Sequence, residues 1–107
     1  MQSLGELEVY EAGELTVVGF GGRTILDHLN IASCRDELME LVQENDCRTL
    51  AFDLTGVPLI PSGLLGVLAS IHAKGIGIQI YNPSDDVLEV LEITKLDTLF
   101  EIHNLEV

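Results

Sequence analysis

Ser62 is the side chain whose position in this sequence most favours chemistry or regulation. It lies within residues 53–68 (DLTGVPLIPSGLLGVL), which are typical of the end of a buried strand, a loop broken by prolines and glycines, and the start of an apolar helix. A hydroxyl at a helix start can accept a hydrogen bond from an amide of the first turn, a cap worth about 1 kcal/mol. A phosphate added there would meet the positive end of the helix dipole and place up to about two negative charges on the surface, which can abolish a protein contact. We therefore interpret Ser62 as a helix cap, a switch, or both.

Catalysis by Ser62 is the weaker hypothesis. The nucleophile elbow of serine hydrolases has the form Gly-x-Ser-x-Gly, whereas Ile60 and Leu64 occupy the two glycine positions here. The histidines that follow the serine are His72, on the same helix, and His103, near the end of the chain. Paired carboxylates would need a cleft, for which a small domain with short loops has little room. We therefore expect no catalytic residue and predict that the protein is not an enzyme.

The histidines and cysteines are interpreted as structural or surface residues. None of the three histidines has a cysteine or an acid at metal-ligand spacing, so we predict no metal site. His28 and His103 are expected at the surface, and His72 near the end of a helix, where a polar tip is favourable. Cys34 and Cys47 form no CxxC pair, and free thiols fit a reducing compartment. Cys34 falls on the apolar stripe of a helix, so we expect it in the core.

Residues 19–22 (GFGG) form a glycine-rich turn after a strand, a pattern that also occurs in phosphate-binding loops. Such a loop needs a helix that opens directly after the glycines, so that its first amides meet the phosphate. Here residues 23–30 intervene, and the Gly-Lys-Ser/Thr signature is missing. We interpret the segment as a turn and predict no cofactor. A small-ligand or nucleotide site at the carboxyl ends of the strands stays open as an alternative.

The length, composition and net charge of the sequence favour one soluble, acidic domain. A length of 107 residues, of which 47% are apolar, fits a single domain over 1–107 with its own core. The net charge of -13 repels nucleic acid and anionic lipid surfaces, so we expect neither as a partner. That charge favours solubility and can steer a basic patch of a partner protein. The N-terminus has no signal-peptide pattern and no apolar stretch reaches ~18 residues, so we expect a cytoplasmic protein.

Hydrophobic patterning predicts strands that alternate with helices after an N-terminal hairpin. Alternating polar and apolar residues indicate a strand at 6–10, and a second strand follows at 15–18. The strands that are joined through helices should pair in parallel with right-handed crossovers. We expect Asn30 or Ser33 to cap a helix that ends at residues 45–46, and a buried strand to follow at 49–54. An apolar helix that ends at residues 74–75 and a strand at 76–80 come next. We expect Ser84 or Asp85 to cap the helix after that strand, and a short helix to form around Leu96, Leu99 and Phe100.

Two segments resemble the STAS domain of bacterial anti-sigma factor antagonists, and the similarity runs from about Leu7 to Ile102. Residues 53–68 resemble the family's Asp-Leu-Ser-Gly-Val, followed by Ile-Asp-Ser-Ser/Thr-Gly-Leu-Gly-Val-Leu. Residues 90–102 (VLEITKLDTLFEI) are similar to the family's ending Leu-Glu-Leu-Thr-Gly-Leu-Asp-x-Leu-Phe-x-Ile. The resemblance implies an α/β fold: a single STAS-like domain with a mixed, mostly parallel sheet of about four to five strands, an antiparallel N-terminal edge strand and about four helices.

The resemblance also implies a role in partner switching. Members of the family bind a serine protein kinase of the ATP-binding type that is also an anti-sigma factor, and phosphorylation of the motif's serine releases this partner. Carried onto this chain, the phosphoacceptor is Ser62, and the partner-binding residues are Thr55, Pro61, Ser62, Gly63 and Leu64.

Three residues next to Ser62 depart from the family's motif. Pro61 replaces an acidic residue, Gly63 replaces Ser/Thr, and Leu64 replaces Gly. Pro61 removes a backbone donor and a charge, and Gly63 weakens helix initiation. The leading hypothesis is a non-enzymatic bacterial regulator of transcription that binds an anti-sigma factor around Ser62 and is switched by phosphorylation. The departures favour an alternative, a STAS scaffold in a signalling assembly without phosphorylation.

Overall fold

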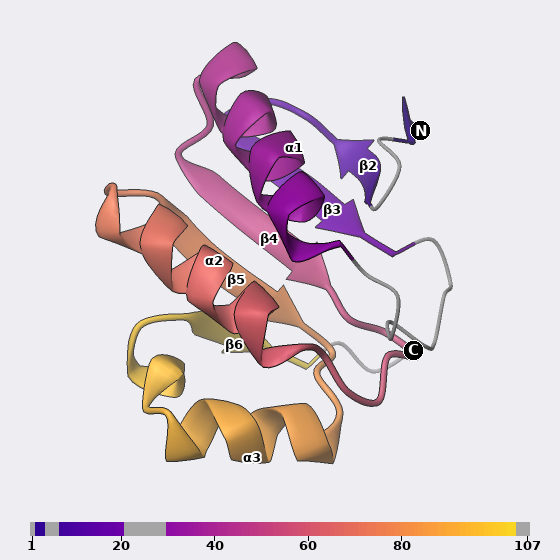
Figure 1. The fold of residues 1–107 in the computed structure, drawn as a ribbon, viewed down its shortest axis with the longest axis vertical. Coiled ribbons are helices and arrows are strands. Elements are labelled where there is room, and N and C mark those ends of the chain that lie inside the picture. Colours follow the sequence, from indigo (N-terminus) through magenta and orange to yellow (C-terminus); the bar gives the residue numbers. More distant parts are fainter. Residues whose placement is uncertain (1, 4–6, 21–29, 105–107) are drawn as a thin grey trace.

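A mixed β-sheet with helices α1 and α2 over one of its faces forms the core of the structure (Figure 1). The computed structural model describes residues 2–3, 7–20 and 30–104, and in these residues the sheet has six strands in the order β1-β2-β3-β4-β5-β6. The strands are β1 (Gln2–Ser3), β2 (Glu8–Glu11), β3 (Leu15–Gly19), β4 (Thr49–Asp53), β5 (Gly77–Tyr81) and β6 (Glu101–His103). The helices are α1 (Ile31–Glu44), α2 (Ser62–Ala73), α3 (Asp85–Ile93) and the short 3-10 helix η1 (Leu96–Thr98).

Strand direction brings two loops to the same edge of the sheet. The pairs β1–β2 and β2–β3 are antiparallel, whereas β3–β4, β4–β5 and β5–β6 are parallel. Each parallel pair is connected through a helix: α1 joins β3 to β4, α2 joins β4 to β5, and α3 with η1 joins β5 to β6. Because parallel strands point the same way, the loops that follow β4 and β5 meet at the carboxyl edge of the sheet.

The core lies between the sheet and its helices. The parallel register places Val18, Phe52 and Ile80 side by side, and all three are fully buried. Their neighbours in the strands point to the opposite face, since successive side chains of a strand alternate. The helices add Cys34, Leu38 and Leu41 from α1, then Leu64, Leu65, Val67, Leu68 and Ile71 from α2, and Val87 and Leu91 from α3. Helix α2 contributes most because apolar residues surround nearly its whole circumference.

The fold class predicted from the sequence is confirmed, as is the antiparallel hairpin followed by parallel strands. The short helix expected around Leu96 is η1. Strand β6 was not predicted, because its three residues are too few to show a hydrophobic period, and the two-residue strand β1 was also missed. Residues 21–22 of the predicted glycine-rich turn, together with His28, lie outside the described residues, whereas Gly19 ends β3.

The structure decides between the alternative caps of two helices. Asn30 caps α1 by accepting a hydrogen bond from the amide of Ser33, with an N···O distance of 3.0 Å. Ser84 caps α3 by accepting one from the amide of Val87 at 3.1 Å. Both side chains satisfy donors that a helix start leaves without partners.

The prediction that Cys34 lies in the core is confirmed. Cys34 and Cys47 are both buried, and neither forms a disulfide bond within the described residues. In the part of the chain that the structure describes, no helix is long and apolar enough to cross a membrane. Within the same residues, no group of three or more His, Cys, Asp or Glu side chains could hold a metal ion.

Candidate functional site

The loop between β4 and α2, residues 54–61, begins with a tight turn. The amide of Val57 donates to the carbonyl of Leu54 at 2.9 Å, and Gly56 has a φ of 80°. A type II turn requires a positive φ at its third position, which glycine adopts without strain. The turn ends the strand and directs the chain across the carboxyl edge of the sheet toward α2.

Thr55 connects the ends of β4 and β5. The carboxylate of Asp53 accepts hydrogen bonds from the amide of Thr55 at 3.0 Å and from its hydroxyl at 2.6 Å. The side-chain amide of Asn82, directly after β5, donates to the Thr55 hydroxyl oxygen at 2.9 Å. Thr55 is exposed, but its hydroxyl already donates once and accepts once. Its predicted partner-binding role would therefore involve its position and shape more than a free hydroxyl.

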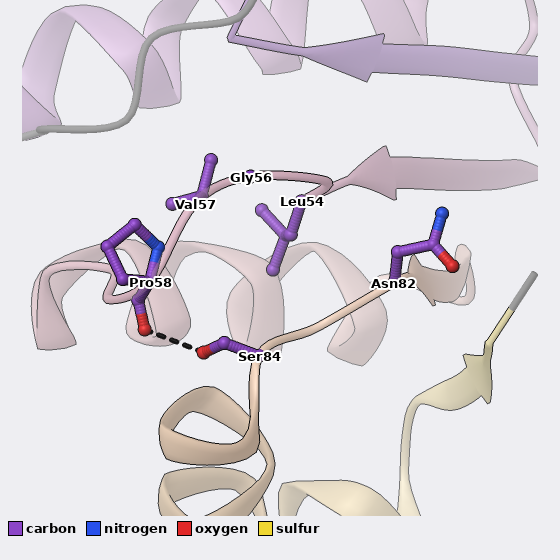
Figure 2. Close-up of a pocket in the computed structure, with 6 residues that line it drawn as sticks. All are labelled: Leu54, Gly56, Val57, Pro58, Asn82 and Ser84. Carbon is purple, nitrogen blue, oxygen red and sulfur yellow. Dashed lines mark hydrogen bonds between the residues drawn. The ribbon is translucent and has the colours of Figure 1, made fainter. Parts of the chain in front are cut away.

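A second bond ties the same loop to the start of α3. The hydroxyl of Ser84 donates to the carbonyl oxygen of Pro58 at 2.6 Å, as the dashed line in Figure 2 shows. Between the two connections lies a shallow, mostly apolar hollow of about 270 Å³, lined by Leu54, Gly56, Val57, Pro58, Asn82 and Ser84. The loop is thus held against the β5–α3 connection at both of its halves.

Ser62 is the first residue of α2, and its prediction as a helix cap is wrong. Pro61 occupies the N-cap position with φ -62° and ψ 140°, and it offers no side-chain cap. The proline ring fixes φ at a value suited to the chain just before a helix, so the helix starts at Ser62, one residue earlier than a serine cap would require. Ser62 is exposed, and its hydroxyl takes part in none of the hydrogen bonds found among the described residues. It remains an accessible hydroxyl at the positive end of a 12-residue helix.

The leucines around Ser62 differ in what they can contact. Leu59, which sequence reasoning did not single out, is 58% exposed, although it is a large apolar residue. Leu64, which the resemblance assigned to partner binding, is 0% exposed and belongs to the core. Leu59 is therefore open to solvent, whereas the side chain of Leu64 holds α2 to the sheet. Exposure depends on the tertiary fold, so the sequence pattern offered no signal that separates the two.

Gly63 lies exposed in the first turn of α2, close to α1. A Cβ built at this position would lie 3.3 Å from the Cγ1 atom of Ile31, the first residue of α1. The glycine therefore allows a close approach of the two helix starts, and a larger residue would require Ile31 to shift.

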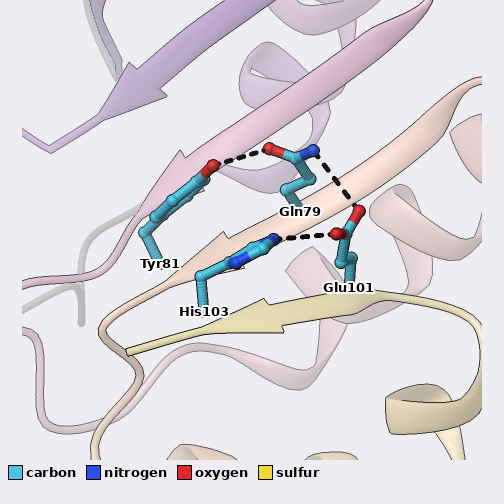
Figure 3. Close-up of polar contacts among 4 residues, drawn as sticks. All are labelled: Gln79, Tyr81, Glu101 and His103. Carbon is cyan, nitrogen blue, oxygen red and sulfur yellow. Dashed lines mark hydrogen bonds and ion pairs between the residues drawn. The ribbon is translucent and has the colours of Figure 1, made fainter. Parts of the chain in front are cut away.

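The open face of the sheet carries a polar cluster, defined by Gln79, Tyr81, Glu101 and His103 (Figure 3). The hydroxyl of Tyr81 donates to Oε1 of Gln79 at 2.9 Å, and Nε2 of Gln79 donates to Glu101 at 3.4 Å. His103 stacks on the Tyr81 ring at a centroid distance of 4.9 Å and lies 3.0 Å from the Glu101 carboxylate. The contacts run along and between β5 and β6, so the cluster fastens the last strand to the sheet.

His72 faces neither of these regions. Its Nδ1 atom lies 3.2 Å from the carbonyl oxygen of Ile76, and its ring makes an edge contact with Phe100. The partly buried ring therefore packs the end of α2 against the chain that follows it, at the end of the helix where the sequence predicted it.

The arrangement defines a small α/β domain that presents a loop and a helix start at the carboxyl edge of its sheet. A model of the STAS domain matches residues 6–106, and the chain belongs to this family. No curated protein matches the sequence.

Two of the solved structures that share the fold show the extent of the likeness. One is an anti-sigma-factor antagonist (STAS) domain protein from Planctomyces limnophilus, with 18% sequence identity, a TM-score of 0.75, and coverage of 94% of this chain and 91% of that chain. The other is the protein TM1081, solved by NMR, with 20% identity, a TM-score of 0.70, and coverage of 97% of this chain and 82% of that chain. At these identities the likeness concerns the fold.

Proposed function

We propose that this STAS domain is a non-enzymatic signalling module that binds an anti-sigma factor with serine kinase activity. The binding surface, here called the Ser62 surface, consists of Thr55, Leu59, Pro61, Ser62 and Gly63. The observation that carries the proposal is the exposed Ser62 at the start of α2, three residues after the exposed Leu59. A large exposed apolar side chain such as that of Leu59 supplies apolar area that a partner can bury. The module would act in the bacterial cytoplasm in the control of transcription.

Phosphorylation of Ser62 is the proposed switch. The hydroxyl has no hydrogen bond to lose among the described residues, so its modification would cost the fold little. The amides of the first turn of α2 have no side-chain cap and can interact favourably with the added negative charge. The same charge would lie in the contact region that includes Leu59. Binding of the partner would remove water from that charge at a cost in free energy, so phosphorylation would release the partner.

A scaffold without the switch is the second candidate. Pro61 stands where the family has an acidic residue, so the chain beside Ser62 lacks both a charge and an amide that a kinase could recognise. In this version, the Ser62 surface holds a partner permanently in a multi-protein assembly.

Incubation with a candidate anti-sigma kinase and ATP distinguishes the phosphorylation switch from the scaffold. Intact-mass measurement followed by peptide mapping should show one phosphate on Ser62 and none in Ser62→Ala. Ser70→Ala is the matched control, because Ser70 is an exposed serine on the same helix and should leave the phosphate in place. A stable complex in which no residue becomes phosphorylated would contradict the switch and support the scaffold.

A further inference from the structure

We infer that Ser84 is a positioning residue for the Ser62 surface: its hydroxyl fixes the loop before α2 at the same time as it caps α3. The anchoring itself is a property of this fold. Its consequence for binding rests on the function proposed above.

One hydroxyl makes both bonds. Ser84 donates its proton to the carbonyl oxygen of Pro58 at 2.6 Å, a contact between residues 26 positions apart in the chain. The oxygen of the same hydroxyl accepts from the amide of Val87 at 3.1 Å. A serine hydroxyl has one proton to donate and two lone pairs to accept with, so the two bonds do not compete.

The anchored segment has little else to hold its backbone. For residues 58–60, the Ser84–Pro58 contact is the one hydrogen bond found among the described residues. The bonds on either side are those of the Leu54–Val57 turn and of the Leu64 amide to the Pro61 carbonyl. Leu59 projects into solvent, so its own side chain contributes little packing. Ile60 packs against the core at the end of the segment, so Ser84 supplies the hydrogen-bonded anchor for its first half, from which Leu59 projects.

Substitutions at position 84 can separate capping from anchoring. Ser84→Asp keeps an oxygen that caps α3, since aspartate is as good a cap as serine, but it has no proton to donate to Pro58. Ser84→Thr keeps both the donor and the cap. Ser84→Ala removes both. If Ser84 were only a helix cap, the aspartate variant would behave like the wild-type protein.

Amide hydrogen exchange measured by NMR on the full chain tests the anchoring without a partner. The Val57 amide reports on the loop, the Leu88 amide, which donates to the Ser84 carbonyl, reports on the start of α3, and amides of β4 report on global opening. Relative to the β4 amides, Ser84→Asp should raise the exchange rate of Val57 roughly threefold to tenfold and leave Leu88 unchanged, whereas Ser84→Thr should change neither. Wild-type exchange at Val57 in Ser84→Asp would overturn the inference.

Titration of the anti-sigma kinase with the same variants tests the consequence for binding. Ser84→Asp should bind more weakly than Ser84→Thr. Equal affinities, together with faster exchange at Val57, would overturn the positioning role. A wild-type protein that binds no kinase would instead contradict the proposed function. The exchange measurement would still test the anchoring by Ser84, because it needs no partner.

Discussion

Leu59 and Leu64 show how a difference in burial assigns different roles to two identical residues near Ser62. Leu59 is 58% exposed and Leu64 is 0% exposed. The sequence motif pointed to Leu64, because it stands within the segment that resembles the family. The structure points to Leu59 as the side chain that a partner can reach.

Alanine substitution of the two leucines should affect different properties. Leu64→Ala should lower the free energy of unfolding by about 2–5 kcal/mol, since it leaves a cavity in the core. Leu59→Ala should change stability by less than about 0.5 kcal/mol, as surface substitutions do, yet weaken binding of the anti-sigma kinase. Chemical denaturation and calorimetric titration measure the two effects. Unchanged binding in Leu59→Ala would remove this residue from the proposed surface.

Among the elements, helix α2 contributes to both the core and the candidate site. Its inward residues pack on the sheet, and its first turn presents Ser62 and Gly63. It also contains Gly66, which is exposed in the middle of the helix, where glycine is unfavourable. A Cβ at Gly66 would meet nothing within 4 Å, whereas a Cβ at Gly63 would meet Ile31 at 3.3 Å.

Gly66→Ala should therefore stabilise the protein by about 0.5–1 kcal/mol, because alanine loses less conformational freedom on folding. Gly63→Ala is the matched control, and its gain should be smaller because Ile31 must shift. Thermal unfolding of both variants beside the wild type is the measurement. A Gly63→Ala protein that gains as much as Gly66→Ala would show that the contact with Ile31 carries no cost.

The elements themselves were largely predictable, and the contacts between loops were not. Long segments such as α1 and α2 show their hydrophobic pattern in the sequence, and the parallel strands follow from their alternation with helices. The prediction that Ser62 caps the helix was wrong because Pro61 occupies the N-cap position, so the helix begins at Ser62 itself. The Ser84–Pro58 bond joins residues that are distant in the chain, so no local pattern could indicate it.

At the scale of the whole molecule, the sheet gathers the site at one edge. Parallel strands bring the loop after β4 beside the loop after β5, and the side chains of Thr55, Asn82 and Ser84 connect them. On the open face of the sheet, the cluster of Gln79, Tyr81, Glu101 and His103 fastens the last strand. The chain carries a net charge of -13, so a partner that approaches the Ser62 surface benefits from basic residues of its own.

We propose that a phosphate on Ser62 controls a protein contact at this surface. The most direct test of this switch is the affinity of the purified anti-sigma kinase for the unmodified chain and for the chain phosphorylated at Ser62, measured by calorimetry in the same buffer. We expect tight binding of the unmodified form and a loss of about a hundredfold on phosphorylation, because burial of the added charge costs several kcal/mol. Equal affinity of the two forms would contradict the switch.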